Sequence, residues 1–452
     1  MVSISAALAR IKDNPQAVLD ESLIEQVCRE LGLEWRNTPL KPPNTIALFI
    51  RQVIEGNVSC ATVRHLGKTD FTPGAYCMAR ARLPLEVLQE YSRRVCDTAQ
   101  CNADDGTQGR YKGHRVWVID GSNFSMPDTP ELQKCFGQHK QQKIGCGFPS
   151  AHLLGLFNLS TGLLQEAIAA PLATHDLFNA SKTHQHLEAG DLVSGDTAFG
   201  SYAHLALLLQ RNLHGLFPVH QIRITSFAPG RKHLGPSGKS AQKGLPRSRW
   251  IKSLGKLDQR VEYFKPADRP NWMSQKDYDL LPDSIEVREI RRTIRRKGFR
   301  PLTVTLVTTL LDAELYPADE LMALQARRWE VETDLRHLKT TMKMEVLHCQ
   351  SQEGVRKELA VFVLVYNLVR TILLEGARRQ AVPVQRLSFA DALHWIRHSR
   401  PGDQLPKLLL NPLRPGRVEP RAVKRRPKAY DLLNKPRDQM RNALKSNRKG
   451  VN

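Results

Sequence analysis

Residues 116–131 read VWVIDGSNFSMPDTPE, and this stretch decides how the rest of the chain is interpreted. Its first four residues, VWVI, are β-branched or aromatic and predict a short strand. We expect that strand to end on Asp120, where Asp-Gly-Ser begins. A carboxylate at the end of a buried strand is costly unless a partner compensates its charge. Asp120 is therefore expected to face a turn, an arginine or a metal ion.

The charge of the chain indicates a polyanionic partner. Among 452 residues, Lys and Arg number 67 against 45 Asp and Glu, which gives a net charge of +22. A surplus of this size is typical of proteins that bind nucleic acid, and less often of proteins that bind an anionic membrane. The hydrophobic fraction of 41% is ordinary for a globular protein, and the length predicts two to four domains.

Nothing in the sequence favours secretion or a membrane span. Residues 1–26 carry several charges and no long apolar run, unlike a secretory signal. The most apolar stretch, LAVFVLVYNLVRTILL at 359–374, is short and is interrupted by Asn367 and Arg370, so it predicts a buried helix. The eight cysteines form no CxxC pair, which favours reduced thiols over a zinc site or disulfides. We expect a cytoplasmic protein without a membrane partner.

Changes in pattern divide the chain into five segments. Strand-like runs after residue 115, a hairpin expected at 158–162 and later helical runs predict an α/β core that begins with an antiparallel meander. Residues 223–256 contain no Asp or Glu and interrupt this core. The expected segments are a helical N-terminal DNA-binding domain (1–110), the first part of the core (111–222), a basic β-rich insertion (223–299), the second part of the core (300–398) and a basic C-terminal segment (399–452). Three separate basic stretches favour double-stranded DNA as the partner.

Two further carboxylates are predicted to join Asp120. Asp196 follows the short strand DLVSG, and the third comes from the helix LQARRWEVETDLRHLKTTMKME at 324–345. Helical periodicity places Glu332 at the edge of the core-facing stripe, whereas Glu330 and Asp334 are expected to point away from it. The stripe itself consists of Leu324, Val331, Leu335 and Leu338.

Three carboxylates from two strands and a helix suit two hard divalent cations. Mg²⁺ prefers oxygen ligands and keeps several waters, so few protein ligands suffice, and Mn²⁺ is the expected substitute. A pair of such ions favours phosphodiester displacement. Taken singly, each residue has a simpler interpretation: Asp120 as a turn residue, Asp196 as a helix cap, and Glu332 as an ion-paired helix position.

The order of these blocks resembles a known family. VIDGS, SGDTAF and RRWEVETDLRHLK are similar to the three catalytic blocks of the IS4-type DDE transposases of bacterial insertion sequences. The helical signature of that family, Tyr-two-Arg-three-Glu-six-Lys, maps onto Arg328, Glu332 and Lys339. The tyrosine position holds Gln325, and Thr197-Ala198 replace a common Arg-Gly pair.

The resemblance implies a ribonuclease H-like mixed-sheet catalytic core interrupted by the insertion. It implies that Asp120, Asp196 and Glu332 bind the catalytic metals. Arg328 and Lys339 would hold phosphates. The implied activity is cut-and-paste transposition through a DNA hairpin, carried out by a dimer on the paired element ends.

Two DNA-contact assignments come from the helix itself. Arg336 lies one turn after Glu332, where a cation could hold phosphate. Trp329 is expected either to stack on an extruded base or to pack in the core.

Two other functions remain open at this point. A catalytically decayed copy would bind element ends without cutting them, and a ribonuclease H-like nuclease would cut without strand transfer. Both alternatives account for the basic composition of the chain. Only the DNA-binding copy would not need the three carboxylates.

Overall fold

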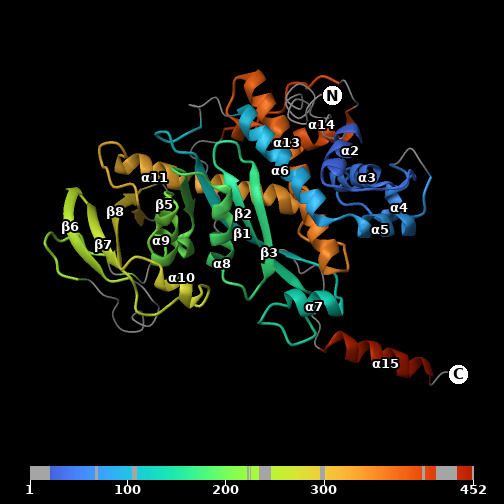
Figure 1. Cartoon of the computed structure of the whole chain (residues 1–452), viewed down its shortest axis with the longest axis horizontal. Helices are drawn as coiled ribbons and strands as arrows, with labels where there is room; N and C mark the ends of the chain where they lie inside the picture. Colours follow the sequence, from blue (N-terminus) through green and yellow to red (C-terminus); the bar gives the residue numbers. More distant parts are fainter. Residues whose placement is uncertain are drawn as a thin grey trace.

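The computed structural model describes residues 21–66, 70–103, 109–220, 223, 225–233, 246–295, 301–399, 403–413 and 435–449. Much of the predicted basic C-terminal segment and parts of the insertion therefore lie outside the described residues. Within them, one nine-stranded mixed sheet runs through the molecule in the order β3-β2-β1-β4-β5-β9-β8-β7-β6 (Figure 1). The predicted α/β class is confirmed.

The sheet begins with the expected antiparallel meander and continues with parallel strands. β1 (Val116–Ser125) pairs antiparallel with β2 (Ser150–Asn158), which pairs antiparallel with β3 (Leu164–Pro171). The hairpin predicted at 158–162 is confirmed. On the other side of β1, β4 (Leu192–Gly195) and β5 (His214–Pro218) run parallel to it.

The strands of the insertion extend this same sheet. β9 (Leu302–Thr308), which follows the insertion in the chain, pairs with β5 on one side and with β8 on the other. The remaining strands follow outward as β8 (Ser284–Ile294), β7 (Asp258–Phe264) and β6 (Ser248–Gly255). The insertion is thus joined to the core by a continuous hydrogen-bonded ladder, while the predicted domain boundaries stay a prediction.

Helices cover both faces of the sheet. One face packs against α6 (Leu85–Ala103), α11 (Ala318–Ala326), α12 (Arg328–Arg336), α13 (Gln352–Gln380) and α14 (Phe389–His398). The other face packs against α8 (Asp176–Thr183), α9 (Tyr202–Gln210) and α10 (Gln275–Asp279). Alternation along β1 sets this division, since Val118 faces the first group and Ile119 faces the second.

The N-terminal part is helical, as predicted. Its helices are α2 (Glu21–Glu30), α3 (Pro42–Ile54), α4 (Cys60–Val63), α5 (Pro73–Arg82) and α6. They lie beside α13 and α14, away from β6 and β7 (Figure 1). At the other end of the chain, α15 (Arg437–Lys449) projects from the body next to α7 (Pro130–Phe136) (Figure 1).

The apolar stretch at 359–374 lies inside α13. This is the one helix among the described residues that is long and apolar enough to cross a membrane, and 94% of its most apolar window is buried within the protein. Ion pairing accounts for the arginine in it: Arg370 donates to Asp334 at 3.2 Å. The prediction of a buried core helix is confirmed.

Two local predictions are wrong. β1 does not end at Asp120 but continues to Ser125, because β2 keeps pairing with it as far as Ser150. The helix expected as one run from 324 is divided: α11 ends at Ala326, α12 begins at Arg328, and a π-helical turn occupies His337–Thr341. The predicted core stripe is nevertheless buried, as Leu324, Val331, Leu335 and Leu338 all lie in the core.

Arg288 provides a test of how firmly the insertion is joined to the core. It is fully buried in β8, pairs with the buried Asp258 at 2.8 and 2.5 Å, and donates to the Asp312 and Tyr316 carbonyls ahead of α11. Arg288→Leu should lower the free energy of unfolding by about 3–5 kcal/mol, because it leaves a buried carboxylate unpaired. Urea denaturation followed by circular dichroism measures this loss.

Arg292→Leu is the matched control on the same strand. Arg292 pairs with Asp319 at 2.8 Å, but the Asp319 side chain is 85% exposed. Its loss should cost no more than about 1 kcal/mol. Equal losses in the two variants would show that burial of the Arg288 pair does not brace the insertion.

Candidate active site

Asp120 and Asp196 are adjacent because the parallel ladder between β1 and β4 stops just before them. Ile119 pairs with Gly195, so the next residue on each strand is an aspartate. Asp196 keeps an extended backbone, with φ −80° and ψ −178°. Neighbouring strands lie about 4.8 Å apart, and residues in register point to the same face. Both carboxylates therefore take the face that α12 covers.

A single guanidinium joins Asp120 to α12. Arg328 Nη1 donates to Asp120 Oδ2 at 2.9 Å, and Arg328 Nη2 donates to Glu332 Oε1 at 2.9 Å. The other Asp120 oxygen, Oδ1, accepts from the Gly121 backbone N–H at 2.8 Å. Asp120 was expected to face a turn, an arginine or a metal ion. In this structure its partner is an arginine, Arg328.

Burial raises the pKa of Asp120 above its usual value. The Gly121 N–H and Arg328 lower that pKa, whereas the negative charges of Glu332 and Asp196 raise it. Asp120 and Asp196 follow the last pair of one parallel ladder, and Arg328 bridges Asp120 to Glu332. The fold thus brings the predicted set together, although Asp196 makes no direct contact with the other two.

These residues fit a divalent cation by charge and donor type. Arg328 bridges only two of the three carboxylates, Asp120 and Glu332, so one positive charge faces three acidic side chains. All three offer the oxygen ligands that Mg²⁺ prefers. Among the described residues, no group of three or more His, Cys, Asp or Glu side chains is already placed to hold a metal. A cation between Asp120 and Glu332 requires Arg328 to move aside.

The predicted phosphate-binding cations line an open cavity beside this ion pair. The cavity has a volume of about 390 Å³ and is bounded by Asp120, Glu332, Arg336 and Lys339, among others. Lys339 lies on the π-helical turn at His337–Thr341. π-turns inside helices are frequent at functional sites because they redirect side chains. Despite the break in the helix, Lys339 still reaches the same cavity as Glu332.

The alternative carboxylates on α12 have other partners. Glu330 points away, as predicted, and pairs with Arg327 at 2.9 Å. Asp334 is turned inward, contrary to the prediction, and pairs with Arg370 of α13. Burial raises the pKa of Asp334 to about 6. Neither residue faces Asp120, so Glu332 is the acid of α12 that the fold directs to the site.

Trp329 is exposed over 65% of its surface, and the alternative that it packs in the core is wrong. The Arg328 guanidinium lies 5.4 Å from its ring centroid. An exposed indole beside the ion pair is available to a ligand.

Asp196 also fulfils its simpler interpretation as a cap. Its Oδ1 accepts from the Ala198 backbone N–H at 2.8 Å and caps the 3₁₀ turn Thr197–Phe199. The other carboxylate oxygen has no such role, and the side chain is exposed. Capping and metal binding are compatible because they use different oxygen lone pairs.

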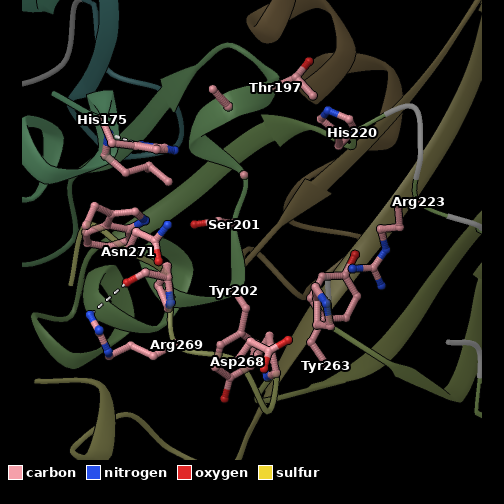
Figure 2. A pocket seen from close by; sticks show the side chains of 18 of the residues that line it. His175, Thr197, Ser201, Tyr202, His220, Arg223, Tyr263, Asp268, Arg269 and Asn271 are labelled. Carbon is pink, nitrogen blue, oxygen red and sulfur yellow. Dashed lines mark hydrogen bonds between the residues drawn. The ribbon is translucent and has the colours of Figure 1, made fainter. Parts of the chain in front are cut away.

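A second, larger cavity of about 670 Å³ lies on the opposite face, between the core and the insertion (Figure 2). His175 and Asn271 line one side of it, and His220, Arg223 and Tyr263 line the other. Thr197 and Ala198, which follow Asp196, also border this cavity, but Asp120 and Glu332 do not. The carboxylate site is therefore separate from this larger cavity.

Sequence patterns missed two residues at the site. Gln325, at the family's tyrosine position, is buried and hydrogen-bonds to Ser194 and Gly195 at the end of β4. Glu345 adds a carboxylate to the wall of the cavity. Only the departure from the family signature could have drawn attention to Gln325, and no sequence signal marks Glu345.

Comparison with protein families gives the assignment. A family model described as the transposase DDE domain matches residues 111–368, which is more than half of the chain and includes all three carboxylates. The chain belongs to this family. The predicted resemblance to IS4-type DDE transposases is confirmed.

Two curated relatives are themselves transposases. The chain is 27% identical over 444 residues to the transposase InsG for insertion sequence element IS4 of Escherichia coli (strain K12), covering 91% of this chain and 92% of the relative. It is 23% identical over 191 residues to the putative transposase InsZ of the same organism, covering 42% of this chain and 58% of the relative.

Two solved transposase structures resemble this DDE transposase more distantly. A cryo-EM structure of the piggyBac transposase synaptic complex with hairpin DNA has 9% identity and a TM-score of 0.41, over 85% of this chain and 79% of that one. A crystal structure of a pre-cleavage Mos1 transpososome has 9% identity and a TM-score of 0.15, over 43% and 66%.

Proposed function

We propose that this DDE transposase moves its insertion sequence by cut-and-paste transposition, using Asp120, Asp196 and Glu332 to bind two divalent cations. The observation that carries the proposal is the Arg328 bridge between Asp120 and Glu332, beside Asp196 and a cavity with Arg336 and Lys339. A ribonuclease H-like core is consistent with the strand order β3-β2-β1-β4-β5.

The chemistry is a series of phosphodiester exchanges. Water first cuts one strand at the element end and leaves a 3′-hydroxyl. That hydroxyl attacks the opposite strand to form a hairpin, water reopens the hairpin, and the same 3′-hydroxyl attacks target DNA. Each step breaks one P–O bond and forms another, so no external energy source is required. Bound Mg²⁺ or Mn²⁺ would activate the attacking oxygen and neutralise charge on the leaving one.

The residues of the chain position the DNA. Arg336 and Lys339 face the cavity and are placed to hold phosphates near the scissile bond. Arg328 is placed to join them once it leaves the carboxylates. Trp329, exposed beside Arg328, offers a ring for a base displaced from the duplex, and such stacking contributes roughly 1–3 kcal/mol per base.

The remaining parts of the proposal concern the assembly and the compartment. The substrates are the terminal inverted repeats of the element and its target DNA, and a dimer is expected because two ends must be held together. The N-terminal helices and the basic segments supply further DNA contacts. The protein acts on DNA in the bacterial cytoplasm.

The carboxylate assignment is tested by cleavage of DNA that carries the gene with its natural flanks. Glu332→Gln and Asp120→Asn should give no cleaved product above the metal-free background, because each removes a charged oxygen ligand. Glu330→Gln, on the same helix, should cleave like the wild type, since Glu330 pairs with Arg327 instead. Gel analysis of end-labelled DNA in Mg²⁺ measures both.

Other outcomes of this experiment identify the alternatives. Wild-type protein that binds the flanks tightly but never cuts them would be a decayed DNA-binding protein. Cleavage without hairpins or joined products would indicate a nuclease. Cleavage by Glu332→Gln at the wild-type rate would remove Glu332 from the site.

The phosphate role of Lys339 predicts a change in salt dependence. Lys339→Gln should weaken binding to flanking and scrambled DNA alike, and should reduce the slope of log affinity against log salt concentration by about one. Fluorescence anisotropy over a range of NaCl concentrations measures this slope.

Lys112→Gln is the control for that measurement. Lys112 precedes the start of β1 and lies at the opposite end of its parallel ladder, so its loss should leave the slope nearly unchanged. A slope unaffected by Lys339→Gln would place Lys339 outside the DNA path.

A further inference from the structure

Gln325 makes two hydrogen bonds at the point where β4 ends. Its Oε1 accepts from Ser194 Oγ at 2.6 Å, and its Nε2 donates to the Gly195 carbonyl at 2.9 Å. The residue is 8% exposed, so both ends of a buried amide are satisfied by one short segment of strand. A glutamine suits this segment because its amide is a donor and an acceptor at once. The next residue is Asp196.

Apart from its cap on the turn Thr197–Phe199, Asp196 has little support from the sheet. β4 has four residues, and its ladder to β5 stops at Ser194 and Leu216. Its ladder to β1 stops one residue later, at Gly195. On the side away from Gln325, Phe199 packs so closely on Gly195 that an added Cβ would lie 2.8 Å from the ring. The last strand residue before Asp196 is therefore held between Gln325 and Phe199.

The same helical segment carries the other acid. Gln325 lies near the end of α11, and α12 begins at Arg328 and presents Glu332 one turn later. Gln325 ties this segment to β4, and Arg328 ties it to Asp120 on β1. Two contacts thus set the position of the helices against the two strands that bear the aspartates.

We propose that Gln325 is a positioning residue that fixes the spacing of Asp196 relative to Asp120 and Glu332, and so sets the affinity of the site for divalent cations. This inference rests on the proposed function. It gives the residue at the signature's tyrosine position a contact with strand β4. Residues that orient metal ligands typically change metal affinity by about 10–100-fold when they are replaced.

Mn²⁺ binding to the DNA-free protein tests the inference without using activity. Gln325→Met keeps the volume and removes both hydrogen bonds, so it should weaken Mn²⁺ binding roughly tenfold or more. Electron paramagnetic resonance of free Mn²⁺ gives the dissociation constant. In cleavage assays the half-saturating Mg²⁺ concentration should rise by a similar factor, while the rate at saturating Mg²⁺ should approach that of the wild type.

Two further variants separate positioning from general stability. Gln259→Met is the matched control: Gln259 is also buried and donates to the Ser226 carbonyl at 2.8 Å, but it lies in β7 of the insertion. It should lower the melting temperature without changing Mn²⁺ affinity. Ser194→Ala removes one of the two Gln325 contacts and should give an intermediate loss of affinity, which keeps the test decisive should Gln325→Met fold poorly.

The outcomes distinguish this inference from the proposed function. Mn²⁺ binding that depends on Asp120 but is unchanged in both Gln325→Met and Ser194→Ala overturns the positioning role alone. Wild-type Mn²⁺ binding that survives Asp120→Asn overturns the metal site itself.

Discussion

The interaction on which the site depends is the bridge that Arg328 makes between a strand and a helix. Asp120 lies within β1, where pairing with β2 fixes the backbone beyond the end of the parallel ladder. Its charge has lost most of its contact with water, and Arg328 compensates that charge at 2.9 Å. Because the same guanidinium holds Glu332, the position of α12 is set by the burial of a carboxylate as well as by its apolar face.

The insertion supports the same helical segment from the other side. β9 pairs with both β5 and β8, so the core sheet continues into the insertion without a break. Arg288 of β8 then reaches the carbonyls of Asp312 and Tyr316, just ahead of α11. Displacement of the insertion would therefore be transmitted to α11 and from there to α12.

Local patterns in the sequence predicted these strands and helices, and they drew attention to Asp120, Asp196 and Glu332. The strand at β1, the strand before Asp196 and the buried stripe of the helix all follow from hydrophobic periodicity, which acts within a few residues. The errors share a different cause. The continuation of β1 depends on β2, the inward turn of Asp334 depends on Arg370, and the role of Gln325 depends on a strand 130 residues away. Such long-range partners cannot be read from one segment.

Arg328 pairs with Asp120 and Glu332 in this structure, whereas its proposed role is to hold phosphate. Three carboxylates converge here, and the Arg328 guanidinium lies between two of them. Burial raises the pKa of Asp120, and the negative charges of Glu332 and Asp196 add to that rise. In the proposed reaction, divalent cations would compensate the carboxylates more fully than a single guanidinium does. Arg328 would then lose its partners beside a cavity already lined by Arg336 and Lys339, and a DNA phosphate would become its nearest anion. In the proposed reaction, a single residue would thus link cation binding to the capture of the scissile strand.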